Sequence, residues 1–200
     1  MASDKKRELT TPDLVLLSLL AERPMHGYQA NLELERRQVR DWASISRPQI
    51  YYSLEKLARM GLIRTGNSED PAAGPERSVY VTTTRGKTAL ATALEKEEWA
   101  TKRDRPAFLT WMALSWQAKA GVFDLQLRRR RQFLEKELAR EEDTLRAIRK
   151  EVGHDFHEAV WMVSLIIEQF RCELLWLQKL TREIERRGPA RDPQYAGEKE

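Results

Sequence analysis

The chain has 200 residues, of which 33% are charged and 41% hydrophobic, a balance typical of a helix-rich soluble protein with charged exposed faces. The net charge of +4 permits a polyanionic partner without demanding one, and residues 1–100 are nearly neutral, so any DNA-binding surface must be a local patch. A single cysteine excludes an intrachain disulfide, and no signal-peptide core or long apolar run is present, so we expect a cytoplasmic protein without a membrane partner. The sequence has no phosphate-binding glycine motif, no C-x-x-C and no evident nucleophile–base pair, so we expect neither a cofactor nor an enzyme.

The first fifty residues carry the signals of three short helices. Residues 1–10 are polar and charged, and we expect them to form a flexible arm. Thr11 and Pro12 predict a helix start, because threonine caps helices well and proline suits their first turn, and Pro24 predicts the helix end. After a turn at residues 25–28, a second helix is expected to continue to Val39. With a third helix behind them, these segments have the order of a helix-turn-helix core.

The third helix has an apolar back and a polar front. Ile50, Leu54 and Leu57 recur at helical spacing, Gly61 predicts the helix end, and four basic residues stand against one acidic residue between positions 42 and 66. Such a helix fits the major groove of DNA, although an ordinary solvated surface helix would have a similar pattern. The residues that we expect to contact DNA are Ser46, Arg47, Gln49, Tyr51, Tyr52, Ser53, Lys56, Arg59, Arg64 and, in the strand that follows, Arg77. Of these, Arg47 and Gln49 are placed to meet base edges, and Lys56 and Arg64 to meet phosphates.

A β-hairpin is expected directly after this helix. Residues 62–65 and 77–82 have the composition of strands, and the loop between them is rich in glycine, proline and acidic residues. Thr83 then predicts the cap of a fourth helix that continues to Trp99. Three helices, two strands and a helix are the element order of a winged helix-turn-helix, which we assign to residues 11–99 as a DNA-binding domain.

This domain carries three groups of short motifs. They are Leu16-Leu17-Ser18-Leu19-Leu20 with His26-Gly27-Tyr28, then Tyr51-x-x-Leu54-x-x-Leu57-x-x-x-Gly61-Leu62-Ile63, and Arg77-x-x-Tyr80-x-x-Thr83-x-x-Gly86. Together and in this order, the motifs resemble the PadR family of bacterial transcriptional regulators. The resemblance implies a transcriptional repressor that binds double-stranded DNA as a homodimer under the control of a small molecule. The tip of the wing departs from a DNA-binding pattern, because its acidic residues Glu69, Asp70 and Glu76 would be repelled by phosphates.

The second half of the chain predicts a helical dimerisation domain over residues 106–187, similar to that of the longer PadR proteins. A short apolar helix at residues 108–116 precedes a long helix from Val122 to Val152 with heptad spacing, and a second long helix runs from about Asp155 to Arg187. The expected fold is therefore mainly α with a small β-hairpin wing, joined to a coiled-coil-like α-helical domain, and residues 188–200 are expected to be a disordered tail. One apolar seam of the last helix is our predicted dimer interface: Val163, Ile167, Phe170, Leu174 and Leu177.

Three tryptophans of the second half are candidates for a ligand pocket. Trp111, Trp116 and Trp161 could line a site for a flat hydrophobic or aromatic effector, or they could fill the core of a wide helical bundle. Both interpretations remain open on the sequence alone.

Two other groups have a structural and a functional interpretation. Cys172 is expected to be a buried structural thiol rather than a redox sensor, and His154 and His157 are expected to cap a helix start rather than bind a metal ion. The sequence thus favours a PadR-like repressor that binds an inverted-repeat operator. The alternatives are a protein–protein adaptor that uses the long C-terminal helices, and a redox- or metal-sensing regulator.

Overall fold

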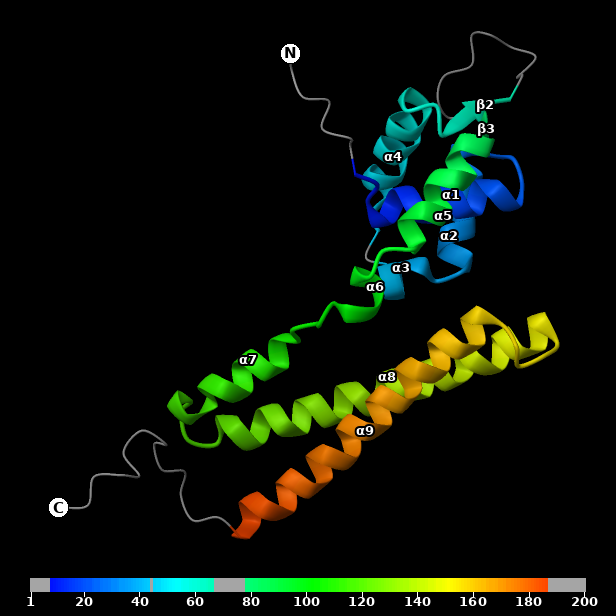
Figure 1. Ribbon diagram of the computed structural model, residues 1–200. Helices are drawn as coiled ribbons and strands as arrows, with labels where there is room; N and C mark the ends of the chain where they lie inside the picture. Colours follow the sequence, from blue (N-terminus) through cyan, green and yellow to red (C-terminus); the bar gives the residue numbers. More distant parts are fainter. Residues whose placement is uncertain (1–7, 44, 67–77, 187–200) are drawn as a thin grey trace, which may run out of the picture. The chain divides into compact units, whose positions relative to one another are not determined.

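The computed structural model describes residues 8–43, 45–66 and 78–186, and the chain divides into two compact units, Met1–Arg103 and Asp104–Glu200 (Figure 1). Most of the predicted arm, the acidic wing tip with Glu69, Asp70 and Glu76, and the predicted tail at residues 188–200 lie outside the described residues.

The first unit has the element order of a winged helix. Its elements are α1 (Thr11–Glu22), β1 (Met25–His26), α2 (Gly27–Arg36), α3 (Val39–Ala43), α4 (Arg47–Arg59), β2 (Ile63–Thr65), β3 (Val79–Thr82), α5 (Thr84–Leu94) and α6 (Glu98–Thr101). The helix that we expected to continue to Val39 is in fact two helices, because Gln38 has a positive φ of 50° between them. The turn expected at residues 25–28 includes a short strand instead, so the wing is an antiparallel sheet of order β1-β3-β2.

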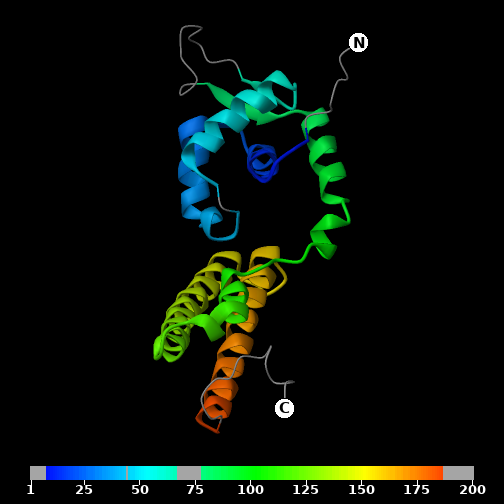
Figure 2. The same ribbon diagram turned by 90° about the vertical axis from the view of Figure 1, so that its left-hand side faces the viewer.

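Helix α1 lies at the centre of this unit. It contacts α2, α4, α5 and β3, and Figure 2 shows it end-on with α4 and α5 on opposite sides. Leu16, Leu17 and Leu20 are buried to 1% exposure or less, because this apolar helix meets neighbours on more than one face. We expected Thr11 to cap α1, but the N-cap is Thr10, one residue earlier. The backbone N–H and the hydroxyl of Thr10 both donate to Asp13 Oδ2.

Helix α4 is the predicted third helix, with its back against α1. Ile50, Leu54 and Leu57 are buried at 2% exposure or less, as their spacing predicted. Gly61 follows with a φ of +67°, a backbone conformation that costs little only for glycine, and the chain turns there into β2. Burial of the apolar face thus fixes which side of α4 is left for a partner.

The wing is tied to the end of α4 through the cap of α5. The Thr83 hydroxyl accepts a hydrogen bond from the backbone N–H of Gly86 (3.0 Å) and lies 3.0 Å from the carbonyl oxygen of Leu62, as the predicted cap requires. A Cβ atom on Gly86 would lie 2.0 Å from the same Leu62 oxygen and 2.9 Å from Thr82 Cγ2. The close approach of α5 to the chain after α4 therefore requires glycine at this position.

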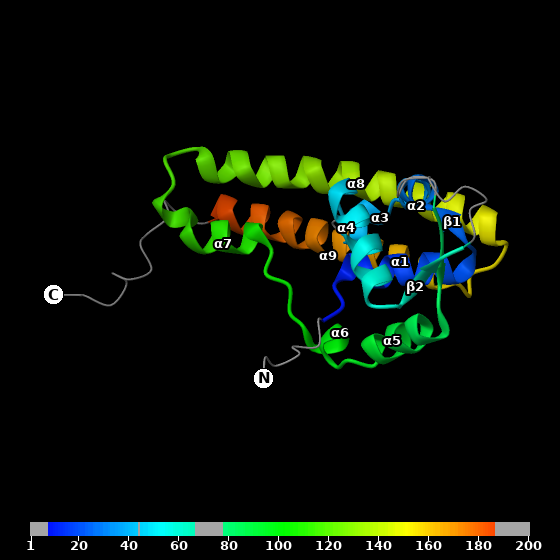
Figure 3. The same ribbon diagram turned by 90° about the horizontal axis from the view of Figure 1, so that it is seen from above.

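The second unit is a long antiparallel helical hairpin with a short helix at one end. Its elements are α7 (Ala107–Leu114), a 3₁₀ turn (Ser115–Gln117), α8 (Val122–Val152) and α9 (Glu158–Arg186), and Figure 3 shows α8 and α9 side by side. The bounds of α8 are those that Gly121 and Gly153 predicted. Across the hairpin, Arg130 forms a two-pronged ion pair with Glu173 at 2.7 and 2.8 Å.

The predicted dimer seam of α9 lies inside this hairpin. Val163, Ile167 and Leu177 are buried at 3% exposure or less within a single chain, and Phe170 and Leu174 pack against a cluster formed by Leu127 and Leu134 of α8 with Leu177. Their assignment to a second subunit was therefore wrong: the heptad pattern of α8 is satisfied by α9 of the same chain. A different face of α9, described below, is left exposed.

No helix of the described ranges is both long enough and apolar enough to cross a membrane.

The contact at Gly86 provides a test of how α5 is held. We expect Gly86→Ala to lower the free energy of unfolding by about 1–3 kcal/mol, because the new methyl group must displace backbone rather than a flexible side chain. For a unit of this size, roughly 4–8 °C in Tm corresponds to each kcal/mol. Gly66→Ala is the matched control, since its Cβ would meet Val79 at an ordinary 3.7 Å. Equal thermal unfolding curves for both variants would contradict the close approach.

Candidate DNA-binding surface

The first turn of α4 is exposed and internally capped. The backbone N–H of Ser46 and its hydroxyl both donate to Gln49 Oε1, at 2.8 and 2.9 Å. This capping arrangement holds the Gln49 side chain beside the helix start. Its amide nitrogen makes no hydrogen bond to another described residue, so it is left as an outward donor.

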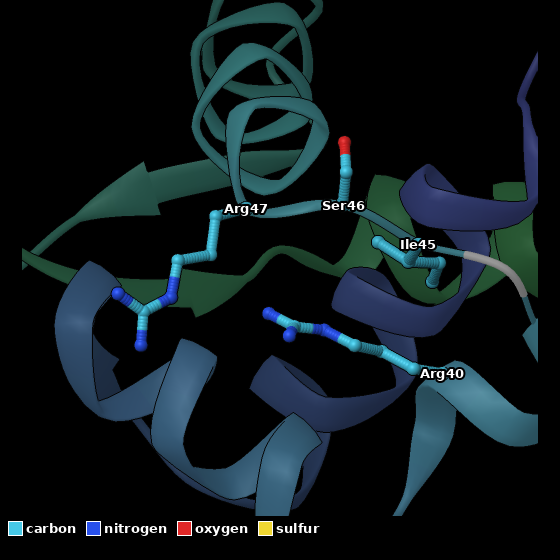
Figure 4. A pocket seen from close by; sticks show the side chains of 4 residues that line it. All are labelled: Arg40, Ile45, Ser46 and Arg47. Atoms are coloured by element: carbon cyan, nitrogen blue, oxygen red, sulfur yellow. The ribbon is translucent and has the colours of Figure 1, made fainter.

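Two arginines meet beside this turn. Arg40 of α3, Ile45, Ser46 and Arg47 line a shallow hollow, into which both guanidinium groups extend (Figure 4). Glu35 of α2 accepts from both arginines through Oε1, at 3.3 Å from Arg40 and 3.0 Å from Arg47. Hydrogen bonding by Arg47 is the main reason that the pKa of Glu35 is lowered, against a smaller opposing effect of desolvation.

The remaining polar residues of this face differ in exposure. Tyr52 is 61% exposed, and Arg59 and Arg64 are exposed, whereas Tyr51 is half-buried against the core as its position relative to Leu54 suggested. Arg77 lies outside the described residues.

Lys56 and Ser53 do not belong to the exposed surface, contrary to our expectation. Ser53 is 2% and Lys56 6% exposed, and Lys56 Nζ lies 2.6 Å from Asp13 Oδ2 and donates to the carbonyl oxygen of Glu8 at 3.0 Å. The ammonium group is directed toward the start of α1 and away from any phosphate. Lys56 is thus a structural residue that joins the middle of α4 to the N-terminus of α1.

The partner of Lys56 is charged at neutral pH. Burial by itself would raise the pKa of the Asp13 carboxyl, but hydrogen bonds from Lys56 and from Thr10 outweigh burial, and the pKa is lowered. Asp13 Oδ2 accepts all of these bonds, while Oδ1 is buried without a hydrogen-bond partner among the described residues. The pair therefore stabilises the fold only while both groups are ionised.

The three candidate effector tryptophans are not brought together in one chain. Trp111 is stacked between Phe108 and Phe123, with ring centroids 5.4 and 5.5 Å away, and packs on the cluster that includes Leu177. Trp116 follows α7 and is 41% exposed. Trp161 is 55% exposed and lies near the other end of the hairpin, roughly 24 Å along α9 from Leu177.

The histidines and the cysteine have different environments from one another. Nδ1 of His154 accepts from Phe156 N and Nδ1 of His157 from Ala159 N, both at 3.1 Å, in agreement with the predicted capping. Among the described residues, no group of three His, Cys, Asp or Glu side chains is arranged to hold a metal ion. Cys172 is exposed, so our expectation of a buried thiol was wrong; it lies on the face of α9 that points away from α8.

Sequence reasoning missed the hollow at the start of α4. Arg40 was assigned to no function, because it lies in a short helix that the periodicity did not separate from α2. Glu35 was missed as well, since nothing in the spacing shows that α2 brings this carboxylate to Arg47, twelve positions along the chain. Only the packing of α2 against α4 reveals these contacts.

A three-stranded wing and an exposed, capped helix packed on a helical core define the first unit as a winged helix-turn-helix domain. Residues 16–92 match the transcriptional regulator PadR-like family, so the chain carries a PadR-like domain.

Solved PadR structures share the fold of nearly the whole chain. PadR from Bacillus subtilis in complex with operator DNA is 17% identical, with a TM-score of 0.66 over 86% of this chain and 98% of that chain. A PadR-like regulator from Bacillus cereus is 19% identical, with a TM-score of 0.65 over 87% and 98%. B. subtilis PadR in complex with p-coumaric acid is 19% identical, with a TM-score of 0.66 over 88% and 99%. No curated protein sequence matches this chain.

The buried pair of Lys56 and Asp13 leads to a prediction about stability. We expect Lys56→Met to lower the free energy of unfolding at pH 7 by about 3–5 kcal/mol, because it leaves a buried carboxylate without its cation. Adding Asp13→Asn should restore part of this loss, since the amide oxygen can still accept from Thr10. Lys87→Met, which removes an exposed lysine of α5, is the control and should have little effect.

The same pair predicts a dependence on pH. Because the pKa of Asp13 is lowered on folding, its contribution is present above the unfolded value of about 3.9 and is lost as the pH falls through the folded value. The difference between wild type and Lys56→Met should therefore shrink in acid, as measured by urea unfolding at several pH values. A difference that stays constant down to pH 2 would contradict the ion pair.

Proposed function

We propose that this protein is a cytoplasmic transcriptional repressor that binds an inverted-repeat operator as a homodimer and is released by a small aromatic effector. The observation that carries the proposal is the exposed first turn of α4, where Arg47 and the amide nitrogen of Gln49 face outward beside the hollow formed with Arg40. Groove-entering helices contact base edges with the residues of their first turns. The PadR-like domain at residues 16–92 supports the same assignment.

The capping of α4 restricts how the Gln49 side chain can contact the bases of DNA. Its Oε1 atom is occupied by Ser46, so the bidentate contact that glutamine makes with adenine is not available while the cap is intact. The free amide nitrogen is a donor, and the acceptors that it would meet in the major groove are the N7 atoms of guanine and adenine, guanine O6 and thymine O4. We therefore assign Gln49 a single donor contact with a purine or a thymine of the operator rather than a bidentate contact with adenine.

Phosphate contacts are assigned to the cations around this turn. Arg40 and Arg47 already share the carboxylate of Glu35, and a phosphate oxygen can replace that partner without reorienting the guanidinium groups. Arg59, Arg64 and the exposed hydroxyl of Tyr52 extend the surface beyond the hollow. Lys56 and Ser53 are left out of the interface because they are buried.

Dimerisation is assigned to the second unit, residues 106–187. An operator with two-fold symmetry requires recognition helices about 34–36 Å apart, and a pair of helical hairpins can set that spacing. This assignment is supported by the exposed apolar face of α9, which is larger than expected for a helix that faces only solvent. The same face also favours a second candidate function, an adaptor that binds a different protein through α9.

An aromatic effector is assigned to the region of α7. The rings of Phe108, Trp111 and Phe123 form a half-buried aromatic stack, and the exposed Trp116 nearby in the chain can offer its ring to a ligand. A structural relative of this chain was crystallised with p-coumaric acid, which is a flat aromatic molecule. To relieve repression several-fold or more, such a ligand must favour the state that does not bind DNA by about 1–3 kcal/mol.

The first test is selection of bound DNA from a random pool, followed by gel shifts with variants. An inverted repeat is expected. Gln49→Ala should cost about 1–3 kcal/mol on the selected site and relax the preference at one position per half-site, whereas Arg59→Ala should weaken all sequences alike and reduce the salt dependence. Gln49→Glu retains the capping oxygen and removes the donor, so it separates readout from helix stability. Lys150→Ala, at an exposed position of α8, is the control. A protein that selects no sequence and binds no DNA would leave the adaptor function.

The second test follows tryptophan fluorescence during titration with p-coumaric acid and related flat aromatic acids. Quenching should track the loss of operator binding in parallel gel shifts. Trp111→Phe should reduce the quenching, while Trp42→Phe in the first unit is the control. A compound that quenches fully and leaves operator affinity unchanged would rule out this mode of control.

A further inference from the structure

The outward face of α9 carries an apolar stripe on the side away from α8. Trp161 is 55%, Leu165 60% and Trp176 43% exposed, and Cys172 is exposed with them. These positions lie at i, i+4, i+11 and i+15, so they share one face of the helix. The residues buried against α8, such as Val163 and Ile167, lie on the opposite side. Helix α9 is therefore apolar on two faces, of which its own chain covers one.

The spacing of this stripe is symmetric. The midpoint of the stripe lies between Glu168 and Gln169. Trp161 and Trp176 are equally far from this midpoint along the sequence, and so are Leu165 and Cys172. A stripe with this property is self-complementary when a second copy of the helix lies antiparallel to it, because each end meets the other end. In a parallel pair of helices in register, each tryptophan would instead meet the same tryptophan of the partner.

The charges at the ends of the stripe have the same symmetry. Glu158 and Lys179 stand equally far from the centre, one at each end. Both are exposed, and neither forms an ion pair with another described residue of its own chain. Antiparallel pairing brings opposite charges together at both ends, whereas parallel pairing brings like charges together.

We propose that a second copy of this chain docks antiparallel on this stripe, with the two-fold axis between Glu168 and Gln169. The register rests on the homodimer of the proposed function and specifies it residue by residue. Trp161 packs on the partner's Trp176, Leu165 packs on the partner's Cys172, and Glu158 pairs with the partner's Lys179.

This register gives α7 a partner surface as well. The outward side of α7 and its 3₁₀ turn exposes Leu109 and Trp116 (54% and 41%), while its inner side packs on the cluster that includes Leu180 and Ile184 near the end of α9. Antiparallel pairing brings the start of the partner's α9 to this end of the hairpin. The partner's Trp161 then lies beside α7, so the aromatic site of Trp111 and Trp116 is completed across the dimer interface.

Charge reversal tests the register. Glu158→Lys or Lys179→Glu alone should raise the dimer dissociation constant roughly three- to thirtyfold at low salt, because each creates two like-charge contacts per dimer. The double variant should restore the wild-type constant. These two residues lie roughly 30 Å apart along α9, so recovery can only come from contacts between chains. Sedimentation equilibrium is the measurement. Single variants with unchanged dimerisation, or a double variant no better than the singles, would overturn the register.

Disulfide trapping provides an independent readout that does not depend on the ion pairs. Leu165→Cys places a thiol opposite the partner's Cys172, so mild oxidation with copper phenanthroline should give a covalent dimer in high yield. The same variant with Cys172→Ser should give none, and neither should Leu175→Cys, whose position faces the partner's Met162. Rapid cross-linking of the wild-type chain through Cys172 alone would place the axis elsewhere and overturn the proposal. All of these measurements are made without DNA, so a failure of operator binding is scored separately.

Discussion

The position of α4 depends on the buried ion pair between Lys56 and Asp13. Leucines of the apolar face hold α4 against α1, but apolar contacts alone permit sliding and rotation, because they have little directionality. The pair adds a directional contact from the middle of α4 to the capped start of α1, where Asp13 also accepts from Thr10. The angle at which Arg47 and Gln49 leave the surface is thus set by a charge that never reaches the surface itself.

The elements that could be predicted are those in which local chemistry and packing agree. The spacing of Ile50, Leu54 and Leu57 identified α4, and Gly121 and Gly153 marked both ends of α8. Lys56 was misassigned because the helical pattern places it at the edge of the polar front. Lys56 is buried because it pairs with the carboxylate of Asp13, forty-three positions earlier in the chain. No pattern in the neighbouring sequence indicates this contact. The contacts of Arg40 and Arg47 with Glu35 were invisible for the same reason.

The error in α9 has a different origin. The sequence has apolar residues on more than one face of this helix, with Val163 and Ile167 on one side and Trp161 and Leu165 on another, but we predicted a dimer contact for only one of these faces. Periodicity does not reveal which face meets the same chain, because both are equally suited to burial. The structure resolves this ambiguity through α8, which covers Val163 and leaves Trp161 outside.

In the hollow beside α4, Glu35 would compete with phosphate for Arg40 and Arg47. A phosphate that reaches Arg40 and Arg47 must displace a carboxylate that already pairs with both, and the displaced carboxylate remains nearby. The two arginines and Glu35 together bring one net positive charge to the DNA, so the salt dependence of binding would understate how many phosphates are touched. Glu35 also weakens non-specific binding to any polyanion, because breaking its ion pairs costs free energy. Only a DNA backbone whose phosphates meet both arginines closely regains that free energy. A single acidic side chain can therefore raise the contrast between correct and random DNA without contacting a base.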